Sequence, residues 1–430
     1  MLLGWCAALF LYGVGAGPLY RTESLRAIIG AEALRGHWLY PVLHGEPFLT
    51  KPPGHYAAIG LASLPTGAVT DITARLPSVV AATVAVFLMV GLFRRTLGER
   101  AGVLVGLLAP CSVLWLDKAP SAEIDMTLVG WVTASLVLLH RALDAPRPRT
   151  AWLVGSLLCV AGGTLTKWTA PAFFALTIVP FLASRRQLRV LVGGPFLLAT
   201  ACAVAVVATW AALVAQAVGW DVLVETVRKE AAYRFAPKPG AKGYPWGEVV
   251  TYPLLVWAAH LPLSLFALRT LRRGFAERWD DRGRTLLVFL HCWAWPNLLF
   301  WALVPNHNVR YALPVSPALM GLGVMGALEW WHVLSPGGAA VRSPGRKPWA
   351  AWARGERERG ADTANAAQGS HPGLSTAAPP GLEAPSQQPA HAGRSPVVAL
   401  VTFLALWLAV KVVFVEVVVP RRTAVRDAAA

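Results

Sequence analysis

The stretch "VLVGGPFLLATACAVAVVATWAALVA", residues 190–215, decides the fold class of this chain. It contains no charged side chain and exceeds the roughly 20 apolar residues that a helix needs to cross a bilayer. Comparable apolar segments recur at 2–17, 76–93, 101–116, 126–139, 152–165, 170–183, 249–268, 286–304, 312–334 and 397–419. The sequence therefore predicts an all-α polytopic membrane protein with about 11 to 13 transmembrane helices.

The overall composition excludes an ordinary soluble domain. Of the 430 residues, 55% are hydrophobic and 14% are charged, whereas soluble domains carry about 25% charged residues. The net charge of +16 is typical of basic cytoplasmic loops and of contacts with anionic membrane lipid. No basic module is interleaved with aromatic residues, so no nucleic-acid partner is expected.

Arginine is distributed unevenly between alternate loops. One set of loops carries Arg94, Arg95, Arg100, Arg141, Arg147, Arg149, Arg185, Arg186, Arg189, Arg269, Arg272, Arg273, Arg278, Arg282 and Arg284. The short loops of the other set hold only Lys118, Lys167 and Arg310. Because basic residues favour the cytoplasmic side, we expect the N-terminus in the cytoplasm and segments 18–75, 216–248 and 305–311 on the outer side.

Composition also divides the chain into three regions. Residues 1–334 hold all but the last of the apolar segments, and the first of these lacks the basic start of a signal peptide. Residues 335–395 are rich in Ala, Pro, Gly, Gln and Ser and bury too little apolar area to offset their ordering entropy. We expect a disordered cytoplasmic insert there, followed by a final transmembrane helix and tail over 396–430.

The first outer segment predicts an amphipathic helix lying in the membrane interface. Leu25, Ile28, Ile29 and Leu34 recur at helical spacing, with Arg26, Glu32 and Arg35 on the other side. Thr22 is placed to cap this helix. Glu23 has two interpretations: an acid that complements the helix dipole, or a general base at the membrane surface.

The stretch "HGEPFLTKPPGHY", residues 44–56, follows as a stiff polar segment. Pro52 and Pro53 fix the backbone and force Lys51 toward an extended conformation. A lysine held at head-group level suits a phosphate, and a lysine that only extends toward the interface is the alternative.

Further charged and aromatic residues mark the remaining outer segments. Membrane-level acids and lysines are costly and usually face a cavity or one another, which predicts either a site or a structural pair among Glu123, Asp125 and Lys167. The basic 216–248 segment adds aromatic side chains, which favour a phosphorylated lipid or a sugar as ligand. The residues selected in the last two outer segments are Arg234, Tyr244, His307, Arg310 and Tyr311.

In this order, the outer motifs resemble the GT-C superfamily of polyprenyl-phosphate-dependent glycosyltransferases, in the bacterial branch of aminoarabinose transferases and protein-O-mannosyltransferase-like enzymes. The matching elements are "TESLRAIIGAEALRGHWLYPVLHGEPFLTKPPGHY", "ARLPS" at 74–78, "SAEIDM" at 121–126, "TLTKWTAP" at 164–171 and "HNVRYALP" at 307–314. The resemblance covers about residues 19–322. It implies a GT-C-like helical bundle with an interfacial helix, in the bacterial inner membrane with its site facing the periplasm.

The resemblance also implies roles for individual residues. Glu23 would be the catalytic carboxylate, although Thr22 stands where the family usually has an aspartate. Lys51, Arg310, His307, Lys167 and Arg234 would bind the donor phosphate, and Asp125, Glu123, Tyr244 and Tyr311 would line the cavity for the acceptor. Thr50 stands where a glutamate often accompanies a divalent metal, which argues against a metal site.

The implied reaction moves a sugar from a polyprenyl-phosphate donor to a lipid, protein or glycan acceptor, with inversion at the anomeric carbon. Two other functions use the same features: a transporter or flippase for lipid-linked glycans, and an inactive relative that only binds lipid phosphate. Transporters commonly show inverted repeats and broken helices in both halves, which are not evident here. The concentration of membrane-level charges on the predicted outer side favours the enzyme.

Overall fold

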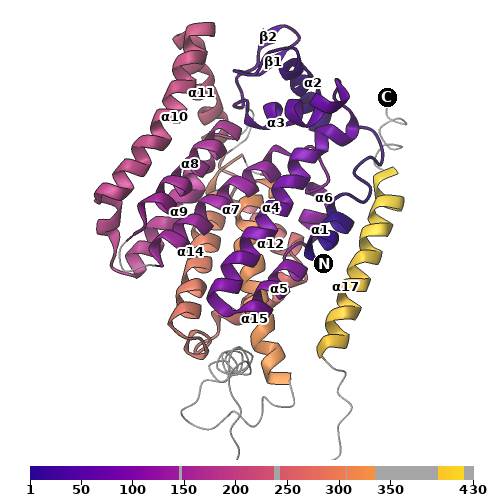
Figure 1. Cartoon of the computed structure of the whole chain (residues 1–430), viewed down its shortest axis with the longest axis vertical. Helices are drawn as coiled ribbons and strands as arrows, with labels where there is room; N and C mark the ends of the chain where they lie inside the picture. Colours follow the sequence, from indigo (N-terminus) through magenta and orange to yellow (C-terminus); the bar gives the residue numbers. More distant parts are fainter. Residues whose placement is uncertain (145–147, 237–242, 307, 335–395, 421–430) are drawn as a thin grey trace, which may run out of the picture.

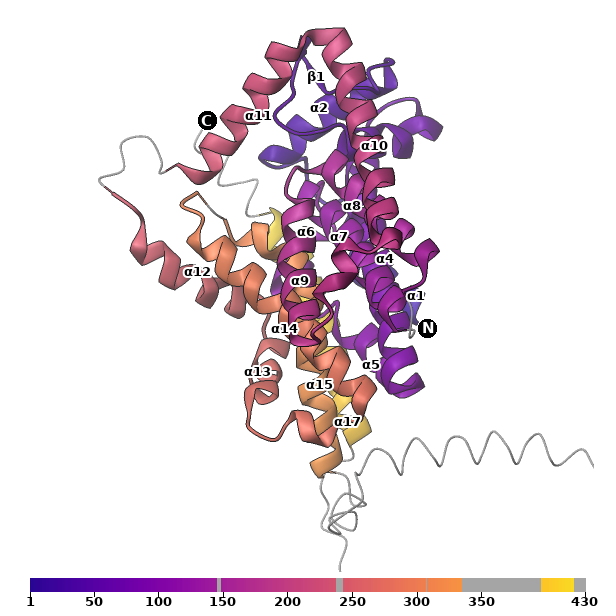
Figure 2. The same cartoon turned by 90° about the vertical axis from the view of Figure 1, so that its left-hand side faces the viewer.

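Long apolar helices packed side by side form the body of the protein (Figures 1 and 2). The computed structural model describes residues 1–144, 148–236, 243–306, 308–334 and 396–420. The expected disordered insert over 335–395 and the tail beyond residue 420 lie outside these residues. The all-α architecture expected from the sequence is confirmed for the described residues, apart from the short β1–β2 hairpin.

Within the described residues, six helical segments are long and apolar enough to cross a membrane. They are α4 (Asp71–Leu97), α7 (Ile124–Leu143), α10 (Gly194–Val218), α14 (Asp281–Leu303), η5 with α15 (Val309–Val315 and Ser316–Leu334), and α17 with η6 (Pro396–Val413 and Phe414–Val418). A seventh is the bent pair α12 (Trp246–Ala259) and α13 (Leu263–Ala267) with η3 (Leu268–Leu271). Two shorter apolar helices, α8 (Thr150–Thr166) and α9 (Ala170–Ser184), pack among them.

The number of helices of spanning length is smaller than the number of apolar segments, because several segments are interrupted. Segment 2–17 is helical only over α1 (Leu2–Phe10), and segment 101–116 is divided between α5 (Glu99–Leu108) and α6 (Val113–Lys118). Further described helices are α11 (Trp220–Phe235), η1 (Leu64–Thr66), η2 (Leu188–Val192) and η4 (Ala276–Arg278).

The segment that was expected on the outer side, residues 18–75, contributes a cap over one end of the bundle (Figure 1). It comprises α2 (Thr22–Leu34), β1 (Val42–Leu43), β2 (Glu46–Pro47) and α3 (Gly54–Ser63). The helix was predicted correctly, but its buried face was not: Arg26 is 6% exposed, whereas Ile28 is 42% exposed. The predicted cap is also wrong, because Arg21 occupies the N-cap position and Thr22 is already helical.

Residues 44–56 form the turn and strut that connect this cap to the bundle. His44 and Gly45, both with positive φ, close the antiparallel β1–β2 hairpin, as its two-residue turn requires. Gly54 then touches the end of α8, where an added Cβ would lie 2.7 Å from Oγ1 of Thr166. That contact places the strut beside the end of α8, one residue before Lys167.

His55 fastens the same strut to α7. Its Nδ1 lies 2.8 Å from Oγ1 of Thr127, and the ring is completely buried. Burial, with a smaller contribution from the charge of Arg26, lowers the pKa of His55 to about 3. The imidazole therefore stays neutral near pH 7 and acts as a structural group.

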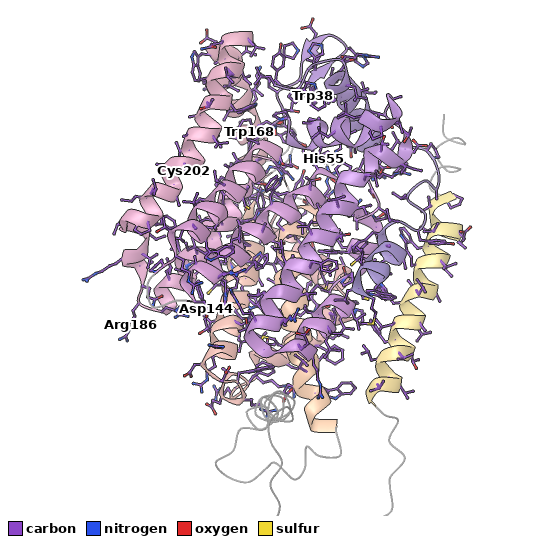
Figure 3. All side chains as sticks on the ribbon, in the orientation of Figure 1. Trp38, His55, Asp144, Trp168, Arg186 and Cys202 are labelled. Carbon is purple, nitrogen blue, oxygen red and sulfur yellow. The ribbon has the colours of Figure 1, made fainter. Side chains whose placement is uncertain are left out.

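Residues of the loops that were expected in the cytoplasm lie toward the end of the bundle away from the cap (Figure 3). Figure 3 shows Trp38 and His55 at the capped end, and Asp144 and Arg186 toward the opposite end. Around that opposite end, Arg269 and Arg278 both bond Glu329 of α15, and Arg95 pairs with Asp144. The capped end instead carries the residues selected as site candidates.

Candidate functional site

The ring of Tyr311 lies at the centre of a group of cations. The Lys167 ammonium and the Arg234 guanidinium each lie 4.5 Å from the ring centroid, and the Arg310 guanidinium lies 5.7 Å away. Lys51 lies close enough for its pKa to respond to Lys167 and Arg234. We call Tyr311 and these four cations the Tyr311 cluster. It joins four segments that are widely separated in the sequence.

Three carboxylates hold the cluster in place. Asp125 pairs with Lys167, and both side chains are buried. Glu123 lies 3.6 Å from Arg310 and 3.0 Å from Arg26. Burial would raise the pKa of Glu123, but Arg26 and Arg310 outweigh that effect and lower it to about 2, so this carboxylate stays ionised.

Lys51 has Glu230 as its ion-pair partner, on α11. It also donates to the carbonyl oxygen of Thr50 at 2.8 Å. The pKa of Lys51 lies below that of an ordinary lysine, mainly because burial disfavours the ammonium. The neighbouring Lys167 and Arg234 lower it further and Glu230 opposes them, so a bound anion would strengthen the charged form.

The cluster retains an excess of positive charge and two unused hydrogen-bond donors. Nη1 of Arg234 and Nε of Arg310 are buried and have no hydrogen-bond acceptor among the described residues. Buried donors normally find a partner, so this arrangement fits a dianionic ligand with several oxygens.

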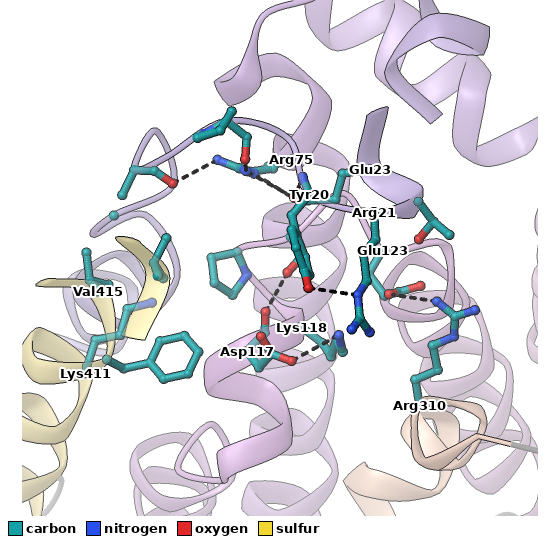
Figure 4. Close-up of a pocket in the computed structure, with 18 of the residues that line it drawn as sticks. Tyr20, Arg21, Glu23, Arg75, Asp117, Lys118, Glu123, Arg310, Lys411 and Val415 are labelled. Atoms are coloured by element: carbon teal, nitrogen blue, oxygen red, sulfur yellow. Dashed lines mark hydrogen bonds and ion pairs between the residues drawn. The ribbon is translucent and has the colours of Figure 1, made fainter. Parts of the chain in front are cut away.

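A pocket of about 480 Å³ opens beside the cluster and is lined by Arg310 of the cluster and by its partner Glu123 (Figure 4). Its wall also includes the predicted base, Glu23. The two oxygens of Glu23 accept from Nε and Nη2 of Arg75, both at 3.1 Å, and from the backbone N–H groups of Tyr20 and Ala122. Each oxygen thus receives two donors, which fills the usual capacity of a carboxylate.

These contacts favour a structural role for Glu23, as the partner of Arg75, over the predicted catalytic role. The substitution Glu23→Gln distinguishes the two roles. We expect it to lower the free energy of unfolding by about 3 kcal/mol, because it leaves the buried Arg75 charge unpaired. The activity that the resemblance implies, sugar transfer, should stay within about tenfold of wild type in the folded variant. Thermal unfolding and transfer measured on the same preparation test this. A stable variant with transfer reduced about 100-fold or more would instead identify Glu23 as the base.

Two predicted residues lie apart from the cluster or outside the described chain. The Tyr244 hydroxyl donates to the carbonyl oxygen of Leu303, and its ring lies 4.7 Å from that of Trp246. Its described contacts thus lie at the end of α14 and the start of α12. His307 is not among the described residues. No three His, Cys, Asp or Glu side chains in the described ranges are grouped as metal ligands.

Sequence reasoning missed three residues that organise the site. Arg75, in the "ARLPS" motif, binds Glu23, and Arg26 binds Glu123. Glu230 belongs to the basic loop but was overlooked as the partner of Lys51. Arg75 could have been found from the sequence, because an arginine within an apolar helix such as α4 is energetically costly unless it has a partner.

Comparison with known proteins agrees with this architecture. Residues 50–212 match the family model "Dolichyl-phosphate-mannose-protein mannosyltransferase". The undecaprenyl phosphate-alpha-4-amino-4-deoxy-L-arabinose arabinosyl transferase of Pseudomonas aeruginosa (strain LESB58) is 30% identical over 295 residues, which are 66% of this chain and 51% of the relative. A second such transferase, from Pseudomonas fluorescens (strain Pf0-1), is 29% identical over 75% of this chain and 58% of its own. The chain thus spans about half the length of the curated relatives it matches.

Solved structures share the fold. The crystal structure of ArnT from Cupriavidus metallidurans bound to undecaprenyl phosphate aligns with 99% of this chain and 72% of its own, with a TM-score of 0.64 and 18% identity. The archaeal oligosaccharyltransferase AglB from Archaeoglobus fulgidus, in complex with an inhibitory peptide and a dolichol-phosphate, covers 83% of this chain and 54% of its own, with a TM-score of 0.50 and 12% identity. In motif order, sequence and fold, this chain is thus similar to the GT-C superfamily, in the branch that includes the aminoarabinose transferases.

Proposed function

We propose that this protein is a membrane glycosyltransferase that moves a sugar from a polyprenyl-phosphate donor to an acceptor. The Tyr311 cluster is proposed to hold the donor phosphate. The observation that carries this proposal is the pair of buried, unsatisfied donors on Arg234 and Arg310 beside two uncompensated positive charges. The donor phosphodiester supplies oxygens and one negative charge, and the second negative charge develops on the phosphate as its bond to the sugar breaks.

The proposed reaction is a single displacement. An acceptor oxygen attacks the anomeric carbon, the bond from that carbon to the phosphate oxygen breaks, and its electron pair leaves with the carrier phosphate. Negative charge grows on the phosphate in the transition state, where Lys51, Lys167, Arg234 and Arg310 would stabilise it. Attack from the side opposite the leaving group inverts the anomeric configuration.

A carboxylate must take the acceptor proton. Asp125 is the carboxylate best placed beside the cluster, with one oxygen on Lys167 and the other 3.9 Å from Arg310. We propose Asp125 for this step in preference to Glu23, whose oxygens are engaged by Arg75. Arrival of the donor phosphate at Lys167 would weaken the hold of that lysine on Asp125 and free an oxygen to accept the proton.

The site is proposed to face the periplasm of a bacterial inner membrane. The arginine-rich loops gather at the end of the bundle opposite the cap, and such loops favour the cytoplasm. Several sequence relatives are named for transfer of 4-amino-4-deoxy-L-arabinose from undecaprenyl phosphate, so that donor is the first to test. The proposed acceptor is a membrane lipid, protein or glycan.

The test supplies purified protein in lipid vesicles with radiolabelled undecaprenyl-phosphate sugars and an extract of bacterial membranes. We expect the label to leave the carrier, undecaprenyl phosphate to accumulate, and the labelled product to appear in the acceptor fraction. Heat-denatured protein provides the control. Label that crosses the bilayer while still attached to its carrier would replace the transferase with a flippase, and tight donor binding without turnover would indicate an inactive relative.

A further inference from the structure

The pocket beside the Tyr311 cluster has more cations than acids in its wall. Its basic members are Arg21, Arg75, Lys118, Arg310 and Lys411, and its acidic members are Glu23, Asp117 and Glu123. Figure 4 shows Lys411 of the α17–η6 helix on one side, Arg310 on the other, and Asp117 and Lys118 between them. The cavity of about 480 Å³ is of a size typical for small-molecule ligands. Because Arg310 also belongs to the cluster, the sugar of a donor whose phosphate lies on Arg310 has this space beside it.

The two acids nearest the cap, Glu23 and Glu123, are engaged by buried arginines. The oxygens of Glu23 accept from Nε and Nη2 of Arg75 at 3.1 Å, besides two backbone N–H groups. Glu123 lies 3.0 Å from Arg26 and 3.6 Å from Arg310. An ammonium group that entered the pocket would have to compete with a guanidinium for either acid, and a buried arginine that loses its acid is costly.

Asp117, the third acid of the wall, is shared by two lysines. Its carboxylate lies 3.0 Å from the Lys118 ammonium, and its charge also acts on Lys411, which is 1% exposed. One carboxylate thus serves two ammonium groups, and a third cation beside them would be repelled. The described wall therefore holds no acid that is available as the counter-charge of a cationic ligand.

Arg21 adds a positive charge that is held in the wall by an aromatic residue. Its Nε donates to the Tyr20 hydroxyl at 2.9 Å, and its guanidinium lies 5.0 Å from the centroid of the Tyr20 ring. Among the described residues, no carboxylate lies within ion-pair distance of Arg21. Tyr20 thus orients Arg21 at the pocket without cancelling its charge.

We propose that this pocket receives the donor sugar and selects a sugar without an amino group, an inference that rests on the proposed function. An ammonium carries three hydrogen-bond donors and no acceptor, so it conflicts in charge and in hydrogen bonding with Arg21, Lys118 and Arg310. A hydroxyl group in the same place can accept from these cations. The arabinosyl transferases to which the chain is similar are named for an amino sugar, so this chain is assigned a different class of sugar.

The test compares two donors that differ in one group. Undecaprenyl-phosphate L-arabinopyranose and its 4-amino-4-deoxy counterpart carry a hydroxyl and an ammonium on the same carbon. Calorimetric titration of the purified full-length protein, in micelles of a neutral detergent, gives the Kd of each donor and requires no acceptor. We expect the hydroxyl sugar to bind at least about tenfold more tightly, because the wall repels the charge of the other.

Two substitutions show whether charge causes the preference. Arg21→Gln removes one exposed cation from the wall, so the ratio of the two Kd values should fall to about threefold or less through tighter binding of the amino sugar. Lys118→Met frees Asp117 from its closest described lysine and should act in the same direction. Arg35→Gln is the matched control: it removes an exposed arginine from the other end of the same helix and should leave the ratio unchanged.

The outcomes separate this inference from the proposed transfer. Equal or tighter binding of the amino sugar by the wild-type protein overturns the inference, and so does a preference that neither Arg21→Gln nor Lys118→Met reduces. Both results leave the proposed transfer intact, because transfer is measured by release of the labelled sugar from its carrier. A protein that prefers the hydroxyl sugar and transfers neither sugar loses the proposed function and keeps the selection by charge. If neither donor binds, both proposals fail.

Discussion

Replacing Lys51 with alanine is expected to reduce sugar transfer from an undecaprenyl-phosphate donor by about 100- to 1,000-fold, the usual effect of removing one charge-stabilising donor from an active site. The ammonium would contact the departing phosphate, on which negative charge grows during the reaction. Because Lys51 is about one-fifth exposed and stands on a loop strut, its truncation should leave the free energy of unfolding nearly unchanged. Initial rates at saturating donor provide the measurement.

Glu230→Gln is the matched comparison for Lys51→Ala. Both variants break the same ion pair, so a purely structural role for that pair predicts the same defect in each. If Lys51 binds donor phosphate, Glu230 only occupies the lysine before the donor arrives. Glu230→Gln should then keep at least one-third of the wild-type rate, whereas Lys51→Ala should not. Equal losses in the two variants would remove Lys51 from the proposed phosphate site.

Lys167→Met should be the most damaging single substitution in the cluster, because it acts on stability as well as on transfer. Asp125 is 1% exposed, and its closest described cation is Lys167. Removing that cation leaves a buried carboxylate with only the more distant Arg310, at a cost of about 3 kcal/mol or more. A lower unfolding temperature in detergent, with transfer abolished, is the expected outcome.

A double variant separates these two effects. Lys167→Met combined with Asp125→Leu removes both charges, and such apolar replacement of a buried pair is often neutral for stability. We expect the unfolding temperature to recover while transfer stays absent, because both the phosphate contact and the proposed base are gone. Recovery of transfer in the double variant would show that the pair is structural only, as would a single variant with normal stability and rate.

Most of the cations and acids that the structure brings together had been selected from the sequence as candidates. Lys51, Lys167, Arg234, Arg310 and Tyr311 were selected as membrane-level charges and aromatics on one side of the chain. The argument worked because charges in apolar surroundings are costly wherever they occur, so the need for partners is visible without coordinates. His307 and the 335–395 insert stay predictions, since they lie outside the described residues.

The errors concern which partner each residue meets. Arg26 was placed on the solvent side of its helix, and Glu23 was considered without Arg75. A helix covered from two sides does not follow a simple amphipathic pattern, so its rotation cannot be read from spacing alone. Lys411 was overlooked because a single lysine in a long apolar run resembles a tolerated exception until the neighbouring helix is known.

By itself, the sequence determined that this chain is a helical membrane protein with its arginine-rich loops at one end. Those properties are sums over local segments, since each apolar run and each basic loop contributes to membrane partitioning independently of its neighbours. Only the tertiary structure decided that Lys51 meets Glu230, 179 residues away, that Asp125 meets Lys167, and that α17 contributes Lys411 to the pocket. Ion pairs require approach within about 4 Å, and helix rotation, depth and packing set such distances only after the whole bundle has assembled.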